Sequence, residues 1–216
     1  MAILKLHGHP FSTCTRRVAT TLAELQIPFE LIEVQLAKGE HKQPAHLAKQ
    51  PFGQIPYIDD DGFILYETRA ICRYLAAKHP AKGLIPKEPK ANAIFEQAAS
   101  AELTNFDPAA SKLGWELVLK KMFIGADPDP KAVEDQLAIL EGKLGAYDVI
   151  LGKTKYLAGD SITLADLFHI PYALLLAQGG NDIMTRKPNV ARWYKELAAR
   201  PCVVRFEGGV KSTASY

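Results

Sequence analysis

The segment HPFSTCTRRV, residues 9 to 18, places two hydroxyls and one thiol within three positions, at Ser12, Thr13 and Cys14. A thiolate is a strong nucleophile and metal ligand. A hydroxyl can instead cap a helix or donate a hydrogen bond to a group that a substrate brings. The segment therefore raises two possible chemistries, one centred on Cys14 and one on a neighbouring hydroxyl.

The elements around this segment predict a small α/β unit in the first 80 residues. Val18, Leu22 and Leu25 recur at helical spacing, with Ser12 or Thr13 as the N-cap. Asp-Gly dipeptides between apolar runs indicate hairpin turns. The order expected is a strand at 2–8, a helix at 13–25, a strand at 29–36, two strands within 54–67 around the Asp61-Gly62 turn, and a helix at 68–79.

The second half of the chain has a different character. Prolines, a glycine and lysines crowd residues 79–90, which predicts a linker. Beyond the linker the pattern indicates helices and no convincing strand. These helices are expected at about 90–123, 130–151, 163–178 and 188–199.

The clearest local motif of the helical half is SITLADL. Thr163 is an N-cap candidate, and Asp166 can reach back to its amide as an acidic capping box. Ile162 and Leu167 can close over the pair as a hydrophobic staple. Because the capping box explains every residue of the motif, we interpret Asp166 as structural rather than catalytic.

Composition excludes several classes of function. No apolar run approaches the roughly 20 residues that cross a bilayer, and the N-terminus lacks a secretory pattern. The formal charge is +2 with both signs interspersed, which favours a solvated surface over a nucleic-acid site. Three widely spaced cysteines fit a reducing compartment, so we expect a cytoplasmic protein. His7 and His9 lack a matching ligand cluster, so no metal is expected.

Three blocks of this chain resemble the soluble glutathione transferases, specifically the phi class. They are HPFSTCTRRV, GEHKQPAHLAKQPFGQIPYIDDDGFILYETRAI and YLAGDSITLADL. The class typically has NPFGQVP where this chain has QPFGQIP at residues 50–56. The resemblance runs to about residue 205. It implies a thioredoxin-like glutathione-binding domain at 1–80, a linker at 81–90, and an all-α domain at 91–216 that contributes the electrophile pocket.

The chemistry expected of such a fold is activation of a thiol that the substrate brings. A free thiol with a pKa of about 8.5 is only roughly 3% ionised at pH 7. Lowering that pKa by about two units takes about 2.7 kcal/mol of differential stabilisation. A helix N-terminus together with one hydroxyl donor can supply this amount.

The resemblance assigns the hydroxyl to Ser12, which matches the serine that donates a hydrogen bond to the glutathione sulfur in the phi class. In cysteine-type relatives of the fold, the reactive cysteine occupies this same position. Cys14 lies two residues further on, inside the predicted helix, and we interpret it as a small buried side chain. A redox or glutathionylation site at Cys14 remains the alternative.

The resemblance also implies a site for each part of glutathione. His41 and Lys42 would hold the glycyl carboxylate. The segment Gln54-Ile55-Pro56 would pair with the cysteinyl backbone through a cis peptide before Pro56. Glu67 and Thr68 would hold the γ-glutamyl group at a helix start, where the class usually has serine at position 68.

Positions equivalent to the family's electrophile pocket are Phe11, Leu36, Trp115 and Leu119. Leu36 and Leu119 could equally belong to the core. Phe52, between Pro51 and Gly53, could pack locally or insert into a partner subunit, and we expect insertion in a homodimer.

The function expected is conjugation of glutathione, as co-substrate, to hydrophobic electrophiles, with peroxide reduction as a second activity. No permanently bound cofactor is implied. Two alternatives from other classes are a carrier of hydrophobic ligands with little turnover, and a Cys14-dependent thiol reductase. The serine at position 12 argues against the reductase, which would need cysteine there.

Overall fold

The computed structural model describes residues 3–216, which form two compact units. The first unit contains residues 3–82 together with 201–216, and the second contains residues 83–200. The predicted helical domain 91–216 therefore extends too far at its C-terminal end. Residues 201–216 belong to the first unit because their backbone bonds to Pro10 and Phe29 near the N-terminus.

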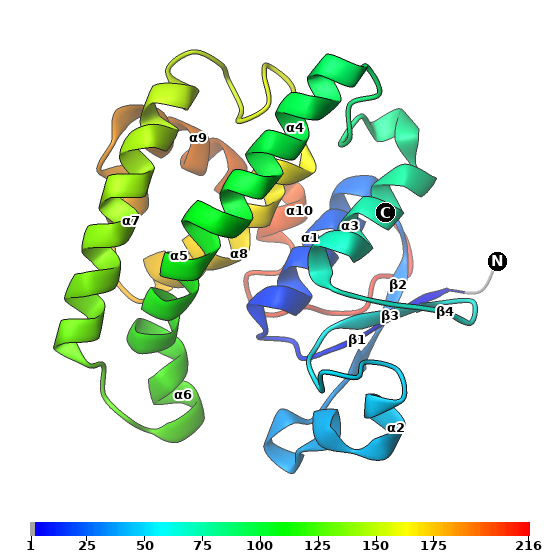
Figure 1. Ribbon diagram of the computed structural model, residues 1–216. Helices are drawn as coiled ribbons and strands as arrows, with labels where there is room; N and C mark the ends of the chain where they lie inside the picture. The colour runs from blue at the N-terminus through cyan, green and yellow to red at the C-terminus, as the bar shows by residue number, and fades with distance from the viewer. Residues whose placement is uncertain (1–2) are drawn as a thin grey trace. The chain divides into compact units, whose positions relative to one another are not determined.

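A four-stranded sheet organises the first unit (Figure 1). Its strands are β1 (Leu4–Gly8), β2 (Phe29–Glu33), β3 (Tyr57–Asp60) and β4 (Phe63–Tyr66), in the order β2-β1-β3-β4. β1 pairs with β2 in parallel, while β1 with β3 and β3 with β4 are antiparallel. This arrangement needs one crossover, which the helix after β1 provides.

The turn between β3 and β4 is the Asp61-Gly62 turn expected from the sequence. Both residues have positive φ, 55° and 91°, as a two-residue turn of type I′ requires. The strand expected at 29–36 ends earlier, at Glu33. The amide of Val34 still donates to Gly8, but a 3₁₀ turn over Leu36–Lys38 then leads the chain away from the sheet.

Two helices, α1 (Thr13–Leu25) and α3 (Thr68–Lys78), pack against each other beside the sheet (Figure 1). Val18 and Leu22 of α1 and Ile71 of α3 are fully buried, so the apolar spacing seen in the sequence forms the core of the unit. A short helix, α2 (Pro44–Leu47), lies in the loop that leads to β3.

The second unit, residues 83–200, consists of helices joined by loops, and its described residues contain one isolated β-bridge, between Tyr156 and Gly159. The helix expected at about 90–123 is present as a continuous helical stretch with two π-helical interruptions. It comprises α4 (Pro89–Ala101), a π-segment (Glu102–Phe106), α5 (Asp107–Gly114), a second π-segment (Trp115–Leu119) and α6 (Lys120–Ile124). The remaining helices are α7 (Pro130–Leu151), α8 (Leu164–Gln178) and α9 (Pro188–Ala198), as predicted to within a residue.

The capping box at the start of α8 is confirmed. Asp166 Oδ2 accepts hydrogen bonds from the amide and the hydroxyl of Thr163, at 2.9 and 3.1 Å. Its Oδ1 accepts from the amide of Leu157 and the indole N–H of Trp193, both at 3.0 Å. Burial still raises the pKa of Asp166, although these hydrogen bonds oppose the effect. The carboxylate therefore ties three separate segments together.

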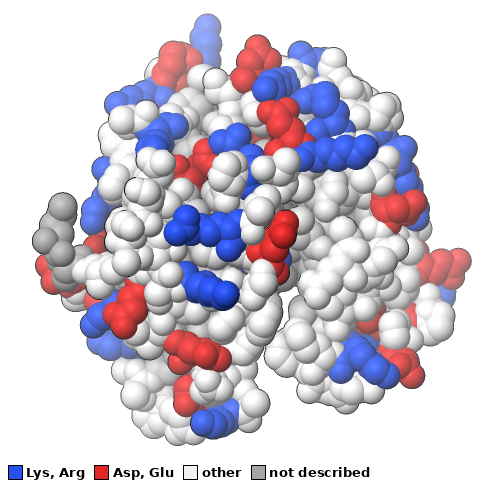
Figure 2. All heavy atoms as spheres, turned by 180° about the vertical axis from the view of Figure 1, so that it is seen from behind, with Lys and Arg blue, Asp and Glu red and all other residues white. Residues whose placement is uncertain are grey.

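Surface charges of both signs lie interspersed on the face that Figure 2 shows. Among residues 3–216, none of the helices combines the length and the apolar character needed to cross a membrane.

Candidate active site

Ser12 caps α1 through its side chain, at the end of a tight turn. The amide of Ser12 donates to the carbonyl of His9 at 3.0 Å, which closes the turn, and its backbone is extended. Ser12 Oγ accepts a hydrogen bond from the amide of Thr15 at 3.2 Å. Since this contact uses only a lone pair, the hydroxyl proton stays available for an outside acceptor. Ser12, rather than Thr13, is the N-cap, and capping is compatible with a catalytic role.

Cys14 is half-buried rather than fully buried, so that prediction was wrong. It lies in the first turn of α1, where Nη1 of Arg17 approaches its sulfur at 3.9 Å. Arg17 itself is only 1% exposed, and the same nitrogen donates to Thr68 Oγ1 at 3.2 Å. The burial of Arg17 and its two contacts could not be predicted from the sequence, because the Arg16-Arg17 doublet has the composition of a solvated pair.

The peptide bond between Ile55 and Pro56 is cis, which confirms the prediction. The loop before it is fixed by two polar side chains that the sequence did not reveal. Gln50 Oε1 accepts from the Gln54 amide at 3.2 Å, and His46 Nε2 bonds the Gln54 carbonyl at 2.8 Å. Loop hydrogen bonds within residues 3–216 include none to the backbone of Ile55.

Glu67 and Thr68 lie where β4 leads into α3, as expected. Glu67 is the N-cap of α3 with φ 68° and ψ 109°, a conformation that is uncommon for a residue with a side chain. Its carboxylate is exposed, while Thr68 is buried and accepts from Arg17. Strained backbone of this kind clusters at ligand-binding positions.

His41 and Lys42 lie in a 3₁₀ turn (Glu40–Lys42) of the same unit. Lys42 Nζ donates to the carbonyl of Gly53 at 2.7 Å, which links this turn to the loop before β3. His41 Nδ1 is buried and has no hydrogen-bond partner among the described residues. Burial, followed by the charges of Lys42 and His46, lowers the pKa of His41. An anion placed here would satisfy the imidazole and offset the repulsion.

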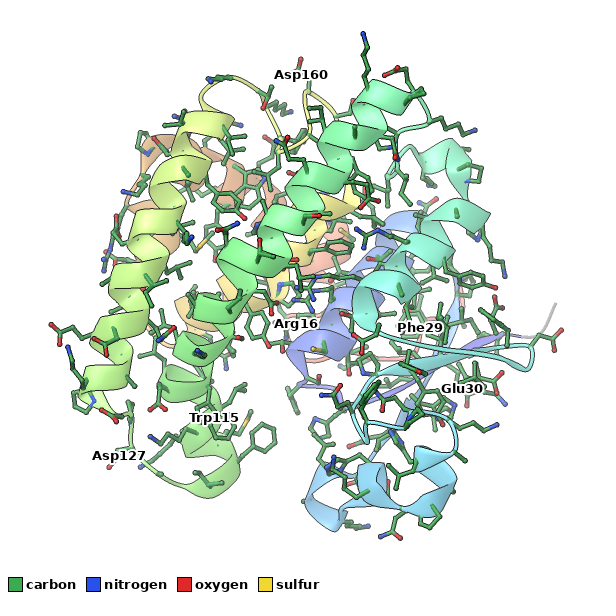
Figure 3. All side chains as sticks on the ribbon, viewed as in Figure 1. Arg16, Phe29, Glu30, Trp115, Asp127 and Asp160 are labelled. Carbon is green, nitrogen blue, oxygen red and sulfur yellow. The ribbon has the colours of Figure 1, made fainter. Side chains whose placement is uncertain are left out.

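The remaining predicted residues are distributed over both units. In the first unit Phe11 is 56% exposed and Leu36 is half-buried. In the second unit Trp115 (labelled in Figure 3) and Leu119 form the two ends of the second π-segment, and Trp115 is 38% exposed. Phe52 is 64% exposed, with its ring 6.1 Å from that of Tyr66. Within residues 3–216 no cluster of three or more potential metal ligands occurs.

Comparison with known proteins identifies the family. Residues 2–77 match the model of the glutathione S-transferase N-terminal domain, and residues 106–201 match that of the C-terminal domain. A glutathione S-transferase of Arabidopsis thaliana, PM239X14, is 44% identical over 90% of this chain and 91% of its own. The chain belongs to the glutathione S-transferase family.

Other members of the family are similar over nearly their whole length. Glutathione S-transferase hmp2 of Hypomyces subiculosus is 44% identical, with 98% of each chain covered. The crystal structure of glutathione transferase F7 from Populus trichocarpa superposes with a TM-score of 0.89 at 37% identity, covering 95% of this chain and 98% of that one. The structure of a maize glutathione S-transferase I in complex with an atrazine glutathione conjugate superposes with a TM-score of 0.88 at 33% identity. The match covers 95% of this chain and 96% of that one.

These comparisons confirm the predicted fold, a thioredoxin-like domain joined to a helical one, and the resemblance to the phi class. They also confirm the predicted enzyme class, a glutathione transferase with glutathione as its co-substrate. The roles of the individual site residues stay predictions.

Proposed function

We propose that this glutathione transferase attaches glutathione to hydrophobic electrophiles, with the hydroxyl of Ser12 donating a hydrogen bond to the glutathione sulfur. The thiolate attacks an electrophilic carbon and forms a carbon–sulfur bond, and the leaving group departs with its electron pair. The observation that carries this proposal is the hydrogen bonding of the Ser12 hydroxyl. Its oxygen already accepts the Thr15 amide, and its proton is free at the N-terminus of α1.

The other contacts follow from the same placement. His41 Nδ1, which has no hydrogen-bond partner among the described residues, and the neighbouring Lys42 suit the glycyl carboxylate. The backbone of Ile55, which makes no loop hydrogen bond within the described residues, suits the cysteinyl peptide groups, and Gln54 is held beside it. Glu67 and the start of α3 suit the γ-glutamyl ammonium and carboxylate. The assignment of Phe11, Leu36, Trp115 and Leu119 to the electrophile pocket stays a prediction from the resemblance. Peroxide reduction stays a prediction.

The assembly and location that we propose are a homodimer in the cytoplasm. The exposure of Phe52 supports the homodimer, because an aromatic ring that is 64% exposed on a short loop is suited to insertion into a second subunit. The three cysteines, all free, fit a location in the reducing cytoplasm.

Two substitutions of Ser12 separate its capping role from its donor role. Ser12→Ala removes both, and we expect kcat/KM for an aromatic halide to fall about 10- to 100-fold, the value of a hydrogen bond to a charged group. Ser12→Asp keeps a good N-cap but offers the sulfur an anion instead of a donor. It should therefore lose at least as much activity as Ser12→Ala, while glutathione affinity changes little in Ser12→Ala.

Cys14→Ala is the matched control, since the side chain lies in the same helical turn. Turnover of Cys14→Ala close to that of the wild type is expected. Full activity of Ser12→Asp would show that only the cap matters, and a large loss in Cys14→Ala would restore the thiol mechanism. Wild-type protein that binds hydrophobic ligands tightly but shows no turnover would favour the carrier.

A further inference from the structure

The end of the chain returns to the turn that carries Ser12. After α10 (Pro201–Val204), residues 206–213, called here the C-terminal segment, run past the start of α1 to the outer edge of β2. Figure 1 shows this segment in red beside the blue connection between β1 and α1. All of these residues belong to the first unit.

The far end of the C-terminal segment is anchored on β2. Thr213 and Phe29 exchange two backbone hydrogen bonds, at 2.9 and 2.8 Å, and Ser212 Oγ accepts from the amide of Leu31 at 2.9 Å. The near end is anchored by Phe206, which is buried and packs edge-on against Phe29 with a ring separation of 6.2 Å. A segment fixed at both ends can hold whatever lies against its middle.

The middle of the segment lies against the turn from His9 to Ser12. The amide of Val210 donates to the carbonyl of Pro10 at 3.0 Å. Gly209, at φ 102°, lies so close to Phe11 that an added Cβ would meet Cε1 of the ring at 3.1 Å. Both contacted residues are inside the turn that the Ser12 amide closes.

Arg16 ties the segment to the other side of Ser12. Its guanidinium, through Nη2, donates to the carbonyl of Phe206 at 2.9 Å and lies 3.5 Å from that of Glu207. Its amide makes the first bond of α1, to the carbonyl of Ser12, at 2.9 Å. Figure 3 labels Arg16 on α1 and Phe29 on β2, which mark the two sides that the segment connects.

We propose that the C-terminal segment is part of the thiol-activating machinery, in which Gly209, Val210 and Arg16 are positioning residues that hold the Ser12 hydroxyl in place for the glutathione sulfur. This inference rests on the proposed role of Ser12. Hydrogen bonds weaken steeply with distance and angle, so a small displacement of the turn removes much of the benefit of the donor. The segment acts through Ser12 and touches no substrate.

Two adjacent glycines provide a matched test. Gly209→Ala places a methyl group against Phe11 and imposes a positive φ on alanine, which should push the turn away. Gly208→Ala meets no atom within 4 Å and has no positive φ. The readout is the apparent pKa of the thiol of bound glutathione, followed by the ultraviolet absorption of the thiolate. We expect Gly209→Ala to raise it by about one unit, a tenfold change in ionisation, and Gly208→Ala to leave it unchanged.

A second pair of variants guards against a folding defect in Gly209→Ala. Arg16→Met removes the donor to Phe206 but keeps an apolar side chain of similar length. Arg205→Met removes a guanidinium from the same stretch of chain, where it stacks 4.7 Å above the ring of Tyr216 and makes none of the contacts to the turn. Of these two variants, only Arg16→Met should raise the pKa of the bound glutathione thiol. Its kcat near pH 6.5 should fall several-fold, while its affinity for S-methylglutathione should change little.

A double-mutant cycle tests whether the segment acts through Ser12. In the Ser12→Ala background, Gly209→Ala and Arg16→Met should cause no further rise in the thiol pKa. If Ser12→Ala alone leaves this pKa at the wild-type value, the proposed function is wrong. If Ser12→Ala raises it but Gly209→Ala and Arg16→Met do not, or if their effects persist without Ser12, the positioning role is wrong.

Discussion

His41 combines a buried, unpartnered ring nitrogen with two cationic or ionisable neighbours, Lys42 and His46. Burial comes first among the causes that lower its pKa, so the imidazole is mostly neutral at pH 7 in the free protein. A carboxylate bound beside it would favour the protonated form. By linkage, the ligand then binds more tightly as the pH falls through the range in which His41 titrates.

We therefore predict that wild-type protein binds S-methylglutathione several-fold more tightly at about pH 5.5 than at about pH 7.5. This ligand has no free thiol, so the ionisation of sulfur does not contribute. The affinity of His41→Asn should be lower and nearly independent of pH. Calorimetric titration measures both, and nuclear magnetic resonance should show the His41 pKa rising on binding.

The control is His79→Asn, which changes an exposed histidine just after α3. Its pH profile should match that of the wild type. Equal pH dependence in the wild type and His41→Asn would exclude His41 as the carboxylate contact.

At the scale of elements, the starts of α7 and α8 could be predicted closely from the sequence. Asp129 caps α7 by accepting from the amides of Lys131 and Ala132, with Pro130 in the first turn. Capping and proline placement depend on residues within one turn, so sequence alone located the starts of α7 and α8 to within a residue.

Features that depend on distant residues could not be predicted. The two π-segments in the stretch from α4 to α6 have no local signature in the sequence. The Arg16-Arg17 doublet has the composition of a solvated pair, but Arg16 bonds Phe206, almost the whole chain length away, and Arg17 bonds Thr68. The same limit explains why the last residues were assigned to the wrong domain.

The capping box of α8 gives a prediction for stability. Asp166→Ala would leave the Leu157 and Thr163 amides and the Trp193 indole without their shared acceptor. Since each buried unsatisfied donor costs about 1–3 kcal/mol, the free energy of unfolding should fall by about 3 kcal/mol or more. Denaturant titration measures this loss.

Asp127→Ala is the matched surface change. That carboxylate is 84% exposed and pairs only with Lys121 in the described part of the chain, so stability should stay near the wild-type value. The turnover of each folded Asp166→Ala molecule should be normal. A specific loss of turnover without loss of stability would instead mark Asp166 as catalytic.

At the scale of the whole molecule, the exposed ring of Phe52 leads to a prediction about assembly. If Phe52 inserts into a second subunit, Phe52→Ser should weaken the dimer by roughly 30-fold or more, as expected for an aromatic residue buried at the centre of an interface. Sedimentation velocity on a dilution series measures the dissociation constant.

Phe123→Ser, on α6, is the control because that ring is also exposed, at 48%. It should leave the dissociation constant unchanged. A monomeric wild type, or a Phe52→Ser protein that dimerises as tightly as the wild type, would contradict insertion.

The position of β2 at the edge of the sheet has a consequence for aggregation after proteolysis. Its outer backbone groups at Phe29 and Leu31 are satisfied by Thr213 and Ser212. A protease that clipped the tail would uncover a ready template for strand addition by another molecule. Trimmed chains should accumulate as insoluble aggregates rather than as inactive monomers, so damage to a few terminal residues would remove the whole polypeptide from solution.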